Sequence, residues 1–310
     1  MKKGILLALR VAIGVIIILF LLFKLDIKDI LHVLTSASPV ILIYILAHFY
    51  FNVFFNAIIL RILLRSIDTK IGFSAVFKWY LISYSIGMFF PGKLGEFSLP
   101  VFLKRKGIDY GKGLSVMTLS KFIVVVAVTI LSVVGLIFLF SVTDSIKVGL
   151  IALAVLLISV VLISNQRVRG FITKNILRKH AAKFTGFFKN IKYMVSKQTH
   201  IVALSLLLVI VRMFVTGFFV YLYFLALGVK VPFIIVPLIN AIALLISLIP
   251  ISISGLGLKE TSVVFLYSLL GVEPVLSGSM QLSLTFFYYI IAGAIILAKF
   301  DKIVLKEEKK

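Results

Sequence analysis

Long apolar runs separated by short polar gaps dominate the pattern along this chain of 310 residues. A run of about 20 apolar residues is long enough for a helix to cross the hydrocarbon core of a bilayer. A series of such runs predicts an all-α polytopic membrane protein, organised as a single membrane domain over 1–310. The six transmembrane helices that we expect are 5–23, 40–60, 114–140, 146–164, 201–227 and 276–298.

Two further apolar stretches, 71–103 and 231–270, are each interrupted by proline and glycine. The first break begins at Pro91 and the second at Pro250, and the second arm of each stretch is short for a full crossing. We therefore expect two re-entrant helical hairpins rather than further full spans. Matched Pro/Gly-broken segments in two halves of a membrane protein point to a substrate site of the kind found in transporters.

The positive charges fall mainly in alternate gaps between the spans. If the amino terminus lies in the cytoplasm, these gaps are the inner loops, as the positive-inside rule requires. Both termini are then expected to be cytoplasmic. The hairpin 71–103 enters from the cytoplasm and the hairpin 231–270 enters from outside. The two halves, 40–140 and 201–298, are therefore predicted to form an inverted repeat.

Alignment of the two halves pairs polar residues that lie inside the apolar runs. An offset of 160 positions pairs Asn52 with Arg212, and an offset of 164 pairs Glu96 with Glu260. Charged groups inside a membrane are expensive, and they are functional candidates by default. We expect a polar cavity between the hairpin tips, where broken helix ends also offer N–H donors to a phosphate. The predicted substrate-binding residues are Lys93, Glu96, Lys121, Arg212, Lys259, Glu260, Asn52 and Thr285.

Several of these candidates also have a purely structural interpretation. Glu96 and Glu260 would equally cap the second arm of their hairpins or pair with a neighbouring lysine. Lys121 lies close enough to a span end to extend its amine towards the interface. His48, Asn52 and Asn56 are spaced to lie on one face of a helix, where hydrogen bonds to neighbouring helices would explain them. Weaker candidates for the cavity wall are Asn240, Ser247 and Gln281.

Composition excludes several classes of protein. Hydrophobic residues make up 62% of the chain, and the mean hydropathy is +1.20. A soluble core has no room for so much apolar surface. The formal charge of +22 then indicates membrane orientation and anionic lipid rather than nucleic acid. The absence of cysteine excludes disulfides, zinc–thiolate sites and thiol catalysis, and we expect no cofactor.

A basic segment, 165–199, joins the two halves and is expected to be a cytoplasmic linker. It holds nine Lys or Arg residues between 167 and 197, with phenylalanine, isoleucine and leucine interleaved. That pattern favours an amphipathic helix on the anionic inner leaflet. A plain linker between the halves is the alternative.

Two segments carry a resemblance to a known family. They are PGKLGE at 91–96, followed by three basic residues at 104–106, and PISISGLGLKE at 250–260. They resemble the signature segments of the lysylphosphatidylglycerol synthase transmembrane-region family, also called flippase-like membrane proteins. The resemblance covers nearly the whole chain and implies that the protein moves or presents lipids across the bilayer. We expect no soluble aminoacyl-transferase domain, and therefore no lipid aminoacylation.

Three classes of function remain open. The first is a multi-pass lipid translocase of the cell membrane that handles a phosphate-bearing headgroup, either of a phospholipid or of a polyprenyl-phosphate-linked lipid. The second is a scaffold or partner protein in lipid-linked glycan or envelope synthesis. The third is a membrane-embedded lipid-modifying enzyme, which we favour least because the sequence holds no catalytic constellation and its four histidines are scattered. A homo-oligomer or a complex with a biosynthetic partner is compatible with each class.

Overall fold

The computed structural model describes residues 39–143, 145–147, 149–151, 154, 186–248 and 255–304. All of the elements in these ranges are helices. The expected span at 5–23, most of the span at 146–164 and most of the basic linker lie outside the described residues.

Four helices match expected spans. They are α3 (Val40–Arg65), α6 (Tyr110–Leu139), α10 (Thr199–Ala226) and α13 (Pro274–Val304). Each is long and apolar enough to cross a membrane, the last over Pro274–Ala298. The prediction of an all-helical, multi-pass membrane protein is confirmed at this level.

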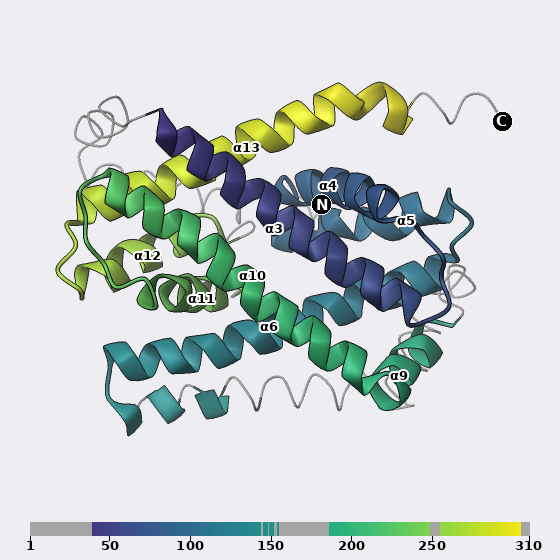
Figure 1. The fold of residues 1–310 in the computed structure, drawn as a ribbon, viewed down its shortest axis with the longest axis horizontal. Helices are drawn as coiled ribbons and strands as arrows, with labels where there is room; N and C mark the ends of the chain where they lie inside the picture. The colour runs from purple at the N-terminus through teal and green to yellow at the C-terminus, as the bar shows by residue number, and fades with distance from the viewer. Residues whose placement is uncertain are drawn as a thin grey trace, which may run out of the picture.

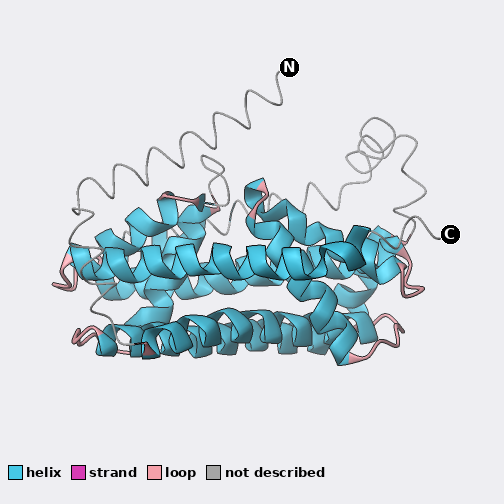
Figure 2. Ribbon diagram, turned by 90° about the horizontal axis from the view of Figure 1, so that it is seen from above, coloured by secondary structure: helices cyan, strands magenta, loops and turns pink. Residues whose placement is uncertain are grey.

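The four long helices run in two opposite directions, two in each (Figure 1). In Figure 1, α3 and α13 run from left to right as the chain advances, whereas α6 and α10 run from right to left. The first long helix of each half, α3 or α10, therefore points opposite to its counterpart, and these two helices pack against each other. Seen from above, most of the described loops lie at the two ends of the bundle (Figure 2).

Each broken stretch folds as two arms that pack against each other. In the first, α4 (Phe73–Met88) is followed by the 3₁₀ helix η1 (Pro91–Ser98) and the short α5 (Leu99–Lys104). In the second, α11 (Ile235–Ser247) is followed by α12 (Leu258–Ser268). The chain reverses between the arms, so η1 contacts α4 and α12 contacts α11. These pairs lie towards opposite ends of the bundle in Figure 1.

The two stretches also end in matching turns. After the first stretch, the amide of Ile108 donates to the carbonyl of Leu103 at 3.2 Å. After the second, the amide of Val272 donates to the carbonyl of Tyr267 at 3.1 Å. Both turns are closed by a glycine with positive φ, as is usual beyond a helix carboxyl end. Three positive-φ positions recur in register, as Asp68 with Gly228, Lys93 with Gly257 and Gly107 with Gly271, whereas Gly255 has a positive φ without a counterpart in the first half.

The core joins both halves of the chain. Phe49 and Val53 of α3 are fully buried in one cluster with Val209 and Met213 of α10. The outward face of α10 instead carries large apolar side chains that are exposed, as expected where lipid replaces water. They include Leu204, Leu207, Phe218 and Leu225.

The end of the basic linker forms α9 (Phe187–Lys197). This helix contacts α6 and α10, with Met194 fully buried and Ile191 packed on the core. Part of its apolar side therefore faces the bundle. Contact of the segment 167–197 with an anionic leaflet stays a prediction.

Gly95 sets the separation between the arms of the first hairpin. A Cβ added at Gly95 would lie 2.7 Å from the backbone carbon and oxygen of Ile86 on α4. We expect Gly95→Ala to push the arms apart at a cost of about 1–3 kcal/mol, typical of overpacking, and to lower the thermal midpoint of the detergent-purified protein by several degrees.

Gly72→Ala is the matched control for this change. Gly72 has φ −70 at the start of α4, and an added Cβ there meets nothing within 4 Å. Its thermal midpoint should equal that of the parent protein. Equal midpoints for Gly95→Ala and Gly72→Ala would contradict the close approach of the two arms.

Candidate functional site

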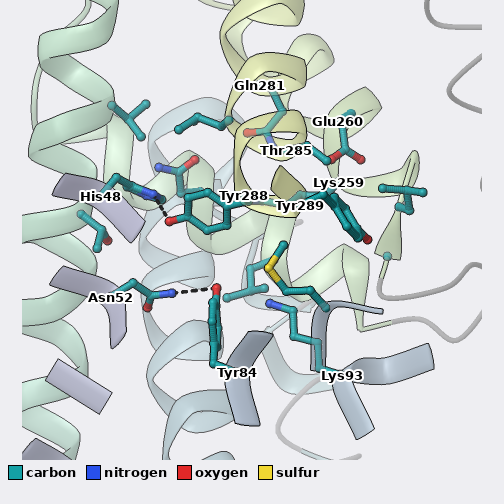
Figure 3. Close-up of a pocket in the computed structure, with 18 of the residues that line it drawn as sticks. His48, Asn52, Tyr84, Lys93, Lys259, Glu260, Gln281, Thr285, Tyr288 and Tyr289 are labelled. Atoms are coloured by element: carbon teal, nitrogen blue, oxygen red, sulfur yellow. Dashed lines mark hydrogen bonds between the residues drawn. The ribbon is translucent and has the colours of Figure 1, made fainter. Parts of the chain in front are cut away.

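A cavity of about 180 Å³ lies where the two hairpin tips meet the long helices α3, α10 and α13 (Figure 3). The first tip contributes Met88 and Lys93, and the second contributes Gly255 and Leu256. Six of the eight predicted site residues line it, namely Asn52, Lys93, Arg212, Lys259, Glu260 and Thr285.

The seam between α3 and α10 forms one wall. Arg212 is 7% exposed, and its Nη1 donates to the Oδ1 of Asn52 at 3.2 Å. The Nδ2 of Asn52 in turn donates to the hydroxyl of Tyr84 at 3.0 Å (Figure 3). The two residues paired by the offset of 160 positions therefore contact each other directly. Asn56 donates to the backbone oxygen of Asn52 at 2.7 Å and does not line the cavity.

A second polar contact joins α3 to α13 across the cavity. The Nδ1 of His48 is hydrogen-bonded to the hydroxyl of Tyr288, as the dashed line in Figure 3 marks. This contact occupies one ring nitrogen of His48 with a neutral partner. His48 therefore forms the interhelical hydrogen bond that the sequence pattern suggested, and it also lines the cavity.

Glu260 combines its two predicted roles. Its Oε2 accepts a hydrogen bond from the backbone N–H of Gly257 at 2.7 Å, which caps the start of α12. Its Oε1 accepts one from the hydroxyl of Thr285 at 2.7 Å, and Gln281 donates to Thr285 at 3.3 Å. The carboxylate is 2% exposed and both of its oxygens have neutral donors. Glu260 therefore holds α12 to α13 at the edge of the cavity.

Glu96 and Lys121 lie apart from this wall. Glu96 is fully buried, and its Oε2 accepts a hydrogen bond from the hydroxyl of Tyr80 at 3.0 Å and forms an ion pair with Lys121. Neither residue lines the cavity. The structure therefore favours the structural interpretation of this pair, because the charge of each residue is met by the other. In both halves the glutamate contacts the side chain 25 positions later, Lys121 or Thr285.

Lys93 and Lys259 enter the cavity from the two hairpin tips (Figure 3). Both side chains are partly buried. The Nζ of Lys93 lies 5.7 Å from the centre of the Tyr84 ring, within range of a cation–π interaction. Lys93 also has φ +57, a left-handed conformation that is uncommon for residues other than glycine.

Sequence reasoning did not identify the aromatic part of the wall. Tyr84, Tyr288 and Tyr289 line the cavity, but aromatic residues inside apolar runs are more often core or interfacial. Their positions could have identified two of them, because Tyr288 and Tyr289 lie one helical turn beyond the candidate Thr285 and therefore on the same face of the helix. Of the weaker candidates, Asn240 and Gln281 line the cavity. Ser247 bonds to the backbone of its own helix instead and does not line it.

The ion pair of Glu96 generates a stability prediction. Lys121→Met leaves a fully buried carboxylate without its cation, and breaking a buried pair in this way costs about 3 kcal/mol. We expect a large fall in thermal midpoint in detergent micelles. The double variant Glu96→Gln, Lys121→Met removes both charges and should recover much of the loss. A double variant no more stable than Lys121→Met would contradict the pairing.

Comparison with protein families identifies the membrane region. The family model described as the lysylphosphatidylglycerol synthase TM region matches residues 7–296, which include every described helix up to most of α13 and the whole cavity wall. Among curated proteins, none matches the chain. The matched family is one of membrane proteins involved in lipid handling. The match covers most of the sequence, and the chain therefore belongs to the lysylphosphatidylglycerol synthase transmembrane-region family.

Proposed function

We propose that this protein is a flippase-like translocase that moves a phosphate-bearing lipid headgroup across the cell membrane. The headgroup enters the cavity between the hairpin tips while the lipid chains stay in the bilayer. The observation that carries the proposal is the gathering of three cations, Lys93, Arg212 and Lys259, from three separate helical segments around one cavity.

The size of the cavity suits a headgroup rather than a whole lipid. Sites that enclose a drug-sized ligand have volumes of roughly 300–1,000 Å³, whereas this cavity measures about 180 Å³. A polar head held there would leave long chains outside. The exposed apolar faces of the long helices provide a surface for such chains.

The cations suit a phosphate in particular. A guanidinium binds phosphate oxygens through paired N–H donors, and lysine amines add charge without fixed geometry. Arg212 is held in place by Asn52, whose side chain is held by Tyr84. Arg212 is therefore oriented before any ligand arrives, which lowers the entropic cost of binding.

An inverted repeat is part of the proposal and has three supports. The corresponding helices α3 and α10 run in opposite directions (Figure 1). The left-handed turns recur in register in both halves. Asn52 and Arg212, which correspond in the repeat, hydrogen-bond to each other. Two corresponding residues can touch each other only near the axis that relates the halves, so the cavity beside them is close to that axis.

The halves differ in what they expose to the cavity. Glu260 and Thr285 border it, whereas their counterparts Glu96 and Lys121 do not. Inverted repeats allow alternating access, because one half can adopt the arrangement that the other holds. We infer that this asymmetry represents one of two states. The hairpins are then re-entrant and enter from opposite faces, with both termini in the cytoplasm.

Arg212 provides the direct test. We expect Arg212→Gln to slow the transbilayer movement of fluorescent phosphatidylglycerol in proteoliposomes about tenfold, corresponding to the loss of about 1.4 kcal/mol of interaction. Dithionite quenching of the outer-leaflet probe measures the rate. Arg212→Lys keeps the charge and should retain part of the activity.

Arg65→Gln is the control, because Arg65 is exposed at the end of α3 and outside the cavity. Its rate should match that of the parent protein, and thermal midpoints of all variants exclude unfolding as the cause. Parent-like movement in Arg212→Gln would contradict the site. Phosphate release or an altered lipid mass in the same vesicles would instead favour a lipid-modifying enzyme.

A further inference from the structure

The cavity carries more positive than negative charge. Among its described lining residues, Lys93, Arg212 and Lys259 are cations and Glu260 is the carboxylate. With His48 counted as neutral, these groups carry a formal surplus of two positive charges. Such a surplus inside a membrane protein calls for compensation, since like charges repel strongly where the dielectric constant is low.

The described part of the chain does not supply that compensation. Arg212 bonds to the neutral amide of Asn52, and Lys93 faces the ring of Tyr84. The oxygens of Glu260 already accept from the amide of Gly257 and the hydroxyl of Thr285. Glu96, the other buried carboxylate of the hairpins, is paired with Lys121. The three cavity cations therefore form no direct ion pair with a carboxylate among the described residues.

The neighbouring segment 249–254, which is outside the described residues, offers no partner in its sequence either. It reads IPISIS and holds neither aspartate nor glutamate. The tip of the second hairpin therefore adds no negative charge beyond Glu260.

The conformation of Lys93 supports a role for its charge. The matching position in the second hairpin is Gly257, and both residues have a positive φ, +57 and +83. Glycine adopts this conformation without steric cost, whereas lysine does not. Backbone strain of this kind is typical of functional sites. The first hairpin thus has a lysine at a position where the second has glycine, the residue that adopts a positive φ without steric cost.

We propose that the cavity selects lipids whose headgroup carries two negative charges, namely a terminal phosphomonoester or a diphosphate. A phosphodiester lipid such as phosphatidylglycerol carries one negative charge at the phosphate and neutralises only half of the surplus. This inference rests on the proposed function, because it names the substrate class of the same cavity. A dianionic headgroup matches the surplus left by Lys93, Arg212, Lys259 and Glu260.

Binding to the purified full-length protein in phosphatidylcholine nanodiscs tests this selectivity. The probes are dihexanoyl phosphatidic acid, a phosphomonoester, and dihexanoyl phosphatidylglycerol, a phosphodiester with the same chains. We expect the phosphomonoester to bind at least tenfold more tightly at pH 8. Inorganic phosphate is the third probe, and it should bind at least tenfold more weakly than phosphatidic acid because it has no chains.

The pH dependence gives an independent readout. A phosphomonoester gains its second charge near pH 6, whereas the phosphodiester keeps one charge. The tenfold preference should therefore shrink towards unity between pH 8 and pH 5. The titratable groups facing the ligand are Lys93, Lys259, Glu260, His48 and the three tyrosines of the wall, with Arg212 charged throughout. Any change in His48 acts on both lipids, so the phosphodiester series corrects for it.

Variants connect the preference to the named cations. Lys93→Gln and Lys259→Gln should each reduce the preference to about threefold or less. Lys93→Gly should do the same while keeping or raising the thermal midpoint, because glycine relieves the left-handed strain. Lys78→Gln is the control, since Lys78 is exposed on the same hairpin and outside the cavity. It should keep the full preference.

The outcomes separate this inference from the proposed function. Equal affinity for the two lipids, with movement of lipid still dependent on Arg212, would overturn the selectivity for a dianionic headgroup. The proposed translocase function would then stand. Failure of both lipids to bind would overturn both. Inorganic phosphate binding as tightly as phosphatidic acid would identify a site for free phosphate and overturn the lipid substrate.

Discussion

A broken helix inside a membrane leaves backbone N–H and C=O groups without helical partners, and each unpaired group costs several kcal/mol in hydrocarbon. The rest of this structure depends on meeting that constraint. At the first break, the amides of Phe89, Phe90 and Lys93 bond to carbonyls three residues back. At the second, Glu260 accepts from the amide of Gly257. The long helices α3, α10 and α13 then line a polar cavity together with Lys93, Gly255 and Leu256 from beside the two breaks.

The same carboxylate shows how a structural requirement and a cavity coincide. Glu260 caps α12 because Gly257 needs an acceptor, and it reaches Thr285 because α12 packs on α13. Its oxygens accept from neutral donors, so it forms no direct ion pair with a cavity cation, and its single charge offsets one of the three positive charges there. Glu96 instead forms an ion pair with Lys121. The carboxylates therefore hold the hairpins in place, and Lys93, Arg212 and Lys259 line the cavity without a direct ion pair to either carboxylate.

Much of the architecture follows from the sequence, because the properties that fix it are local and periodic. The long apolar runs gave α3, α6, α10 and α13, and the Pro/Gly breaks gave the two-armed stretches. The offset of 160 positions made Asn52 and Arg212 corresponding residues of the repeat, and their direct hydrogen bond is a finding of the structure. The side-chain directions of Glu96 and Lys121 did not follow, since they depend on the packing of α4 against η1. The Tyr84, Tyr288 and His48 wall depends on contacts up to 240 positions apart.

The repeat is nearly regular in its backbone and irregular in its charges. Left-handed turns recur in register, but Lys93 matches Gly257, Arg212 matches Asn52 and Lys121 matches Thr285. At each matched pair, one half supplies a cation and the other a neutral residue. A fully symmetric pair of halves would double each cation and raise the repulsion in a medium of low dielectric constant. Dividing the cations between the halves keeps their number low. The positive charge of the cavity therefore comes from both halves, with Lys93 in the first and Arg212 and Lys259 in the second.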